Sequence, residues 1–299
     1  MNRPYLPEGM NESYRANAAA LATPADAQKY LRDHIPLEVI AQRCDRQHNL
    51  HATLGGCAAV IPRSEAISSA VSGAQKEISV LSLVGKPVCC RVSAIATDCN
   101  GQPLLELSRR SLQEEALSYL QSRLTEGSVL PARITSLSPI GAFADIGCGI
   151  TALLPLRQIS VSRIRHPCER FLPRQEILAA ALKIDREQCR FLLTHKELLG
   201  TWQENAALFQ EGETVQGVVR GVKSYGVFIE LTPNLTGLAE PEDTLRHGER
   251  VSVLIKAILP EKHKIKLHII DRLGRAEAPA ALRYFIRSGS ISGWHYFAE

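Results

Sequence analysis

Three stretches of the chain place one ring-bearing side chain within a run of alternating apolar residues. These are GVFIEL with Phe228, GAFADI with Phe143 and LHATL with His51. Side chains of a β-strand alternate between its two faces, so each ring shares a face with a polar neighbour and the apolar residues occupy the other face. An outward ring can stack on an unpaired nucleic-acid base whatever the identity of that base. The three rings are therefore candidate base-stacking positions.

Cationic side chains accompany the rings. In KHKIKLHII, Lys264 and Lys266 alternate with Ile265 and Leu267, so one strand face is apolar and the other offers donors to phosphate groups. Lysines on a solvated strand face usually serve only solubility, and a single outward Phe often packs under a loop. The recurrence of ring and cation in successive segments favours binding over that explanation.

A loop in the middle of the chain, SVSRIRHPCERFLPR, is rich in arginine. Its residues Arg163, Arg165, His166 and Arg170 could form a phosphate-contacting arm beside Phe143. A guanidinium can both stack on a base and pair with a phosphate. The alternative is a solvated loop, which is about as plausible for any single one of these residues.

Other chemistries fit the sequence less well. Cys44, His48, His51 and Cys57 are zinc-ligand types, but their spacing lacks the close ligand pairs of structural zinc sites, so we expect no metal. Cys89 and Cys90 are expected to point to opposite faces of one strand. The chain contains neither a phosphate-binding Gly-x-x-x-x-Gly-Lys loop nor a Gly-x-Ser-x-Gly turn, and no spacing marks a Ser-His-Asp triad. We therefore expect no catalytic residues, no enzymatic activity and no cofactor.

The ring-bearing stretches belong to a repeated unit. Passages that begin at Gly127 and Gly212 share the order glycine, alternating run, Gly-x-Phe, short alternating run and turn, and a second alternating pair follows each of them. Five short strands separated by turns predict a small barrel. A weaker copy begins near residue 36 and has Asn49-Leu50-His51 in place of Gly-x-Phe.

The expected fold is mainly β, with three tandem five-stranded barrels joined by short helical linkers. A short helix is expected after Thr23-Pro24, because Thr would cap it and Pro would occupy its first position. The aromatic-rich end of the chain suggests no particular role. The expected segments are a partly helical leader (1–35), module 1 (36–110), a helical linker (111–126), module 2 (127–196), a second helical linker (197–211), module 3 (212–272) and a C-terminal tail (273–299).

Composition gives a modest indication of a nucleic-acid-binding protein and argues against membrane insertion. The 299 residues carry a net charge of +4, and residues 127–196 alone hold ten basic and five acidic residues. No apolar stretch is long enough to span a bilayer, and the start of the chain lacks a signal pattern. The eight cysteines form no Cys-x-x-Cys pair, as in reduced cytosolic proteins. We expect a cytoplasmic protein without a membrane partner.

Specific stretches resemble the S1-type RNA-binding domain, a five-stranded OB-fold barrel, and the tandem arrangement resembles the family of bacterial ribosomal protein S1. They are SRIRHPCERF, KIDREQCRFLLTHKELLGTW, YGVFIEL and LLELSRRSLQEEAL. The resemblance covers residues 36–272. In that family two aromatics beside the glycine turn, a histidine on the third strand and cations near the last hairpin contact RNA.

The three modules match these RNA-contacting positions of the family to different extents. Module 3 matches with Tyr225, Phe228 and Lys264, but Glu240 replaces the third-strand histidine and would repel phosphate. Module 2 keeps Phe143 and Arg190 and has Ile140 and Pro155 at the other two positions; module 1 has His48, His51 and Pro62. The candidate RNA contacts are Phe143, Tyr225, Phe228, Arg133, Arg163, Arg165, His166, Arg190, Lys223, Lys264, Lys266, His48 and His51.

The sequence thus predicts a protein that binds single-stranded RNA, in particular mRNA, with little sequence preference. The small ribosomal subunit and translation are the expected context, and tandem weak sites would add up by avidity. Two alternatives stay open: a scaffold whose barrels dock proteins, and an accessory subunit of an RNA-processing complex. Module 1, the most divergent copy, is the candidate for protein docking.

Overall fold

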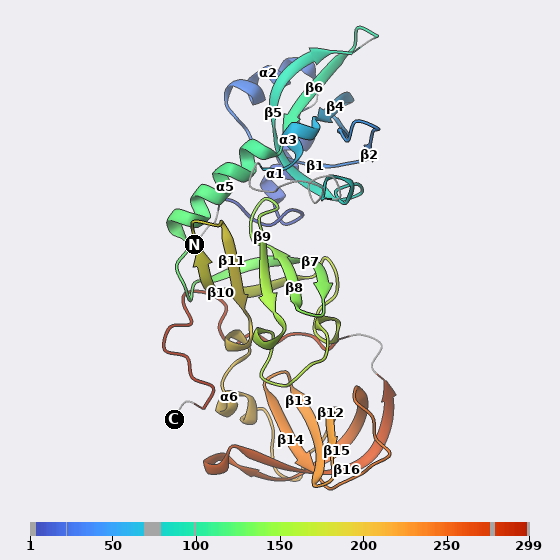
Figure 1. The fold of residues 1–299 in the computed structure, drawn as a ribbon, viewed down its shortest axis with the longest axis vertical. Coiled ribbons are helices and arrows are strands. Elements are labelled where there is room, and N and C mark those ends of the chain that lie inside the picture. Colours follow the sequence, from blue (N-terminus) through green and yellow to red (C-terminus); the bar gives the residue numbers. More distant parts are fainter. Residues whose placement is uncertain (1–3, 22, 69–78, 99, 276–278, 298–299) are drawn as a thin grey trace.

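A computed structural model describes residues 4–21, 23–68, 79–98, 100–275 and 279–297. The protein is elongated, and its three β modules follow one another along the long axis (Figure 1). Modules 2 and 3 are closed five-stranded barrels, whereas module 1 is a six-stranded sheet that forms a half-barrel. The predicted fold class is confirmed, with a difference in the first strand of module 1. Within the described part of the chain, no helix is both long and apolar enough to cross a bilayer.

The first strand of module 1 is broken into two pieces. Strand β1 (Leu37–Ile40) pairs with β5, and β2 (Arg43–Cys44) pairs with β3, so one extended segment changes partners at residues 41–42. The sheet order is β1-β5-β6-β4-β3-β2. The remaining elements are β3 (Leu50–Leu54), β4 (Cys57–Ile61), α3 (Arg63–Ala66), β5 (Pro87–Thr97) and β6 (Pro103–Ser108).

Modules 2 and 3 share one topology, in which the third and fifth strands pair in parallel and close the barrel. Module 2 contains β7 (Val129–Ser138), β8 (Gly141–Asp145), β9 (Thr151–Pro155), η1 (Leu156–Gln158), η2 (Pro167–Glu169), β10 (Glu176–Asp185) and β11 (Arg190–Thr194). Module 3 contains β12 (Thr214–Lys223), β13 (Gly226–Thr232), β14 (Leu235–Ala239), β15 (Glu249–Leu259), η4 (Pro260–Lys262) and β16 (Lys264–Arg275).

The glycine of each Gly-x-Phe motif lets the first residue of the second strand lie close to the backbone of the third strand. Gly141 and Gly226 have φ of +154° and +153°, and a Cβ at these positions would lie 2.2 Å from the Leu154 carbonyl oxygen and 2.6 Å from that of Ala239. A side chain would therefore collide with backbone, which cannot move aside cheaply. The motif thus fixes where the ring-bearing strand begins.

The alternating residues fill the barrels as expected. Ala142 and Ala144 of β8 lie in the core of module 2, and Val227 and Ile229 of β13 lie in the core of module 3. The small alanines of β8 leave room for Phe171 and Phe191, which are both buried in the same core. The rings of Phe143 and Phe228, on the opposite parity, belong to neither core.

The N-terminal segment and first linker join modules 1 and 2. Helix α5 (Arg110–Arg123) packs Leu112 against Cys89 and Cys148, and it packs Leu120 into the core of module 2. Its neighbour Arg109 is buried and forms a two-pronged ion pair with Glu8. Cys90 lies in the core of module 1, so the expected opposite orientation of Cys89 and Cys90 is confirmed.

Two helices precede module 1, namely α1 (Glu12–Ala20) and α2 (Pro24–Arg32). Thr23 caps α2 through a reciprocal pair of hydrogen bonds with Asp26, so the predicted capped helix is confirmed. Between modules 2 and 3 the chain forms η3 (Lys196–Leu199) and the short helix α6 (Trp202–Ala206).

The C-terminal tail folds back along modules 2 and 3 (Figure 1). The Phe285 N–H donates to the Leu198 carbonyl, and the Tyr284 hydroxyl accepts from the Leu178 N–H. Farther along, the Trp202 N–H donates to the Tyr296 carbonyl and the Tyr296 hydroxyl donates to the Asn234 carbonyl. The tail therefore straps the two barrels together, a role that its sequence did not suggest.

His195 should make the strapped region sensitive to acid. Burial lowers its pKa to about 4, and its ring nitrogens lie 2.8 Å from the Ile159 carbonyl oxygen and 3.1 Å from the Tyr284 hydroxyl. Because the folded state binds the proton less readily than the unfolded state, stability is present above pH 6.5 and is lost as the pH falls toward 4. We expect a loss of about 2 kcal/mol in the free energy of unfolding between pH 7 and pH 5.

Urea denaturation of the parent and of His195→Gln at both pH values checks this expectation. The loss should be about 2 kcal/mol smaller in the variant, which carries no titrating ring. Equal losses in both proteins would contradict the role assigned to His195.

Candidate nucleic-acid interface

Module 3 presents an aromatic platform that ends in a cation. Phe228 on β13 is opposite Leu238 on β14, and Leu238 is beside Lys266 on β16. The Tyr225 ring meets the Phe228 ring edge-on, with centroids 6.0 Å apart, and 64% of Tyr225 is exposed. The row is therefore Phe228, Leu238 and Lys266, with Tyr225 beside its aromatic end. Lys264 and Lys223 are exposed on flanking positions.

Module 2 repeats the row on its own strands. Phe143 on β8 is opposite Leu153 on β9, which pairs with Leu192 on β11, and Leu192 is opposite Lys183 on β10. Arg190 precedes Leu192 by two residues, as Lys264 precedes Lys266. The cation at the end of the row thus shifts from the fifth strand in module 3 to the fourth strand in module 2.

The platform of module 2 lies between two hollows. One, of about 480 Å³, is lined by Phe143, Leu153, Lys183 and Arg190 among others. The other, of about 610 Å³, is lined by Phe143 and Arg190 and by residues of the module 1 side that include Lys86. The Phe143 ring therefore lines both hollows together with Arg190, although Asp185 also lines the first hollow and Glu8 and Asp145 also line the second.

Module 1 lacks the chemistry of this row. His51 on β3 is opposite Val60 on β4, which is beside Glu106 on β6. Glu106 therefore places a carboxylate at the position in module 1 that corresponds to Lys266 in module 3. His51 itself is held by Asp45, with 2.9 Å between its Nε2 and a carboxylate oxygen.

The two histidines of module 1 belong to the turn between β2 and β3, or contact it. The hydrogen bond from His51, together with donors from Asn49 and Gln47, holds the pKa of Asp45 well below its usual range. His48 adopts a left-handed backbone (φ +64°) in that turn and is partly buried. Neither Cys44 nor Cys57 joins these residues in a metal-binding arrangement, since no group of three or more His, Cys, Asp or Glu side chains in the described ranges could hold a metal ion.

Two other predicted contacts have structural partners. The Arg133 guanidinium donates to the carbonyl oxygens of Glu8 and Arg174 and so fastens the N-terminal segment to module 2. The His166 ring accepts from the Cys168 N–H and caps η2. Both side chains therefore form hydrogen bonds within the protein.

The arginine-rich loop lies against module 3 and not beside Phe143. The Ser162 N–H donates to the Pro233 carbonyl, and the Val161 N–H donates to the Asn234 side chain. Arg163 and Arg165 are exposed on this loop, and Arg165 lines a pocket with residues of module 3. The expected arm is thus displaced to the junction of modules 2 and 3.

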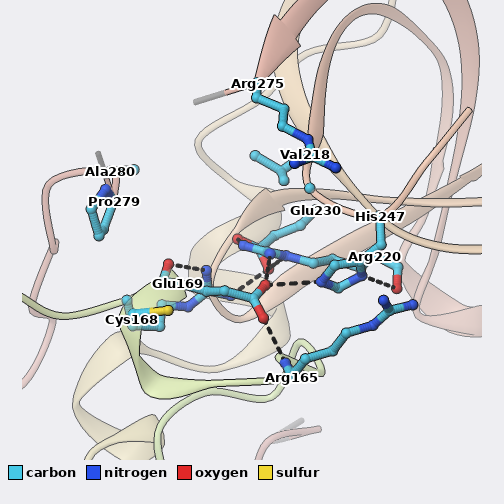
Figure 2. A pocket seen from close by; sticks show the side chains of 12 residues that line it. Arg165, Cys168, Glu169, Val218, Arg220, Glu230, His247, Arg275, Pro279 and Ala280 are labelled. Carbon is cyan, nitrogen blue, oxygen red and sulfur yellow. Dashed lines mark hydrogen bonds and ion pairs between the residues drawn. The ribbon is translucent and has the colours of Figure 1, made fainter. Parts of the chain in front are cut away.

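A buried ion-pair network holds that junction. Glu230 of β13 accepts from both Arg170 of the loop and Arg220 of β12, which approaches with Nε at 2.7 Å and Nη2 at 3.1 Å. Arg220 also pairs with Glu169, whose carboxylate lies 3.0 Å from the His247 ring nitrogen. In Figure 2 the Glu169 carboxylate faces both Arg220 and His247. Side chains from two modules thus share one cluster of charges, which we call the junction network.

Burial sets the ionisation of the junction network. Burial raises the pKa of Glu169, but the Arg165 N–H and the charges of Arg220 and His247 outweigh it and bring the pKa below its ordinary value. Burial and the neighbouring Arg220 lower the pKa of Arg170, against the opposing effect of Glu230. The surroundings thus favour the charged form of Glu169 and disfavour the charge on Arg170.

Sequence reasoning missed Glu230. Its parity places it on the outer face with Phe228, which suggests a solvated carboxylate, yet its side chain is only 6% exposed. Its partner Arg170 is 60 residues away on another module. No local sequence pattern predicts an ion pair between residues so far apart in the chain.

Glu240, the residue expected to repel phosphate, is balanced locally. Hydrogen bonds from Lys256 and His268 hold its pKa at about 2. Its carboxylate lies 2.5 Å from the Lys256 ammonium and 3.2 Å from the His268 ring. The pairing offsets the negative charge but also engages the Lys256 ammonium and the His268 ring of this face.

Parts of the chain are similar in sequence to known proteins. Residues 123–196 match the S1 RNA binding domain family. The chain is 32% identical over 180 residues to small ribosomal subunit protein bS1 of Rickettsia conorii, which covers 54% of this chain and 32% of the relative. It is 29% identical over 206 residues to the bS1 homolog of Bacillus subtilis, which covers 63% of this chain and 54% of the relative.

The chain therefore spans about a third to a half of the length of these relatives, and the resemblance inferred from the sequence is confirmed. A solved structure of a multidomain protein with nucleic acid binding domains from Streptococcus pneumoniae covers 79% of this chain. The alignment covers 73% of that structure at 12% identity, with a TM-score of 0.27.

Glu230→Gln should destabilise the junction strongly. The substitution leaves two buried guanidinium groups without their shared carboxylate, which typically costs about 3–5 kcal/mol. Glu240→Gln is the matched control, because its carboxylate is 54% exposed and exposed pairs contribute about 1 kcal/mol or less. Urea denaturation of both variants measures the difference. Similar small losses would show that the junction network does not stabilise the fold.

Proposed function

We propose that this S1-like protein binds single-stranded RNA with little sequence preference through the outer faces of modules 2 and 3. The observation that carries the proposal is the repeated row of ring, leucine and cation across each barrel. The ring offers stacking to a base, and the cation offers an ion pair to the phosphate that follows.

The chemistry of the row favours a single strand. Stacking on Phe143 or Phe228 requires a base whose face is open, and bases within a duplex already stack on one another. The rows hold no amide side chain, and amides are the usual readers of adenine edges. Their side chains contact π faces and phosphates, which are common to all sequences.

Tandem sites raise the affinity. The junction network and the C-terminal tail hold modules 2 and 3 together, so a strand bound by one platform meets the second at high effective concentration. Because the two platforms are held in a fixed arrangement, little entropy is lost when the second one engages.

We propose that this RNA binding serves translation. The relatives named above are small ribosomal subunit proteins, and we propose that the chain acts in the cytoplasm on mRNA at the small subunit, by binding and without catalysis. Module 1 supports a second role, because Glu106 and the tethered His51 leave it without a platform. We propose that it docks a protein partner, on the ribosome or in an RNA-processing complex.

Phe143→Ala and Phe228→Ala should each weaken RNA binding by about 1–3 kcal/mol, the usual loss when a base loses its stacking partner. This corresponds to about 5- to 150-fold in dissociation constant. Titration of labelled oligouridine by fluorescence anisotropy measures the change.

Ile40→Ala is the control, because it removes an exposed apolar side chain (53%) from module 1, outside the two platforms. Duplex RNA of the same length should bind more weakly, and binding should weaken as salt rises. Unchanged affinity in the double variant of Phe143 and Phe228, or equal affinity for duplex, would refute the proposed function.

A further inference from the structure

A pocket of about 450 Å³ opens at the junction of modules 2 and 3. Its walls are the loop of module 2 that carries Arg165, the outer face of β12 and β13, and Pro279 and Ala280 of the tail. Figure 2 shows Arg165 and Arg275 on opposite sides of the junction network. The pocket is therefore lined by both modules.

The pocket carries more positive than negative charge. Four arginines line it, against two glutamates. Both glutamates are engaged by Arg170, Arg220 and His247. Neither Arg165 nor Arg275 makes an ion pair with any residue that the structure describes. Two guanidinium groups thus remain to attract an anion.

The surroundings strengthen this attraction. The side chains of Arg170 and Arg220 are almost fully buried, so solvent screens their charges less than it screens charges on an open surface. A cleft lined by one excess charge concentrates counter-ions more than a flat surface does. The Glu169 carboxylate accepts the Arg165 N–H at 2.7 Å and so fixes the loop that presents this guanidinium.

We infer that this pocket binds a phosphate group of the RNA backbone, an inference that rests on the proposed function. A guanidinium pairs with phosphate through two parallel hydrogen bonds, which makes arginine well suited to this anion. The phosphate would be held between Arg165 of module 2 and Arg275 of module 3.

The position of the pocket points to a strand and not to a free nucleotide. Glu230 at the pocket floor follows Phe228 by two residues on the same face of β13, a distance of about 7 Å along the strand. Arg220 is adjacent to Gly221, which pairs with Phe228. A base stacked on Phe228 therefore leaves its neighbouring phosphates near the pocket.

This site couples RNA binding to the junction. A phosphate in the pocket contacts both modules and neutralises the excess charge between them. RNA should therefore stabilise the arrangement of modules 2 and 3, in addition to bridging their platforms.

The test is the double variant Arg165→Gln and Arg275→Gln in the full chain. We expect about a tenfold higher dissociation constant for oligouridine. We also expect the slope of log K against log salt to become shallower by about 0.7, the value for one neutralised phosphate on a single strand. The control is Arg246→Gln with Arg287→Gln, which removes the same charge from exposed residues that do not line the pocket.

The outcomes separate the two proposals. An affinity and a salt slope equal to those of the control would overturn this inference, and the proposed function would stand if Phe228→Ala still weakens binding. A parent that binds no oligouridine would overturn both. Uridine monophosphate is the second probe: if it occupies the pocket as tightly as the oligonucleotide does, the site serves a free nucleotide and the inference fails. A thermal unfolding curve like that of the parent excludes misfolding of the variant.

Discussion

Closure of the two barrels is the constraint on which the candidate interface depends. Once β8 and β13 are sealed into closed sheets, alternate side chains must either enter the core or face outward. Ala142, Ala144, Val227 and Ile229 take the inner positions, so Phe143 and Phe228 are turned outward. The same closure places the third strand beside the fifth in parallel, and this sets Leu238 next to Lys266 and Leu153 next to Leu192. The platform is thus a consequence of barrel topology.

Buried charges and the C-terminal tail then convert separate barrels into one unit. Glu8 links modules 1 and 2, because its carboxylate pairs with Arg109 and its carbonyl accepts from Arg133; the junction network links modules 2 and 3. Such pairs contribute less to stability than their short distances suggest, because each charge loses its hydration. We expect these pairs to fix the arrangement of the modules, because a different docking would leave buried charges unpaired. Fixed geometry between the platforms is what tandem binding requires.

Much of the fold could be predicted because its signals are local. The period-two alternation around Phe143 and Phe228 assigns faces, and the Gly-x-Phe motif marks the start of the second strand. The rest depends on contacts between distant residues. The sequence predicts that Glu230 is a surface carboxylate, whereas the fold brings Arg170 of another module into an ion pair with it. Likewise, Arg133 is predicted to contact phosphate, whereas in the fold it donates to the carbonyl oxygen of Glu8. The tail gave no periodic signal because it binds through backbone groups and single rings such as Tyr284. In module 1 the first strand divides because its two halves pair with different neighbours, which no local pattern records.

The most direct test of the account is to locate the bases on the protein. Oligouridine that contains 4-thiouridine can be cross-linked to the full chain by light, and the attached peptides identified by mass spectrometry. The account predicts cross-links in β8 and β13, at Phe143, Tyr225 and Phe228, and their loss when duplex RNA is supplied. Cross-links confined to module 1 or to the tail, with the two platforms unmarked, would contradict it.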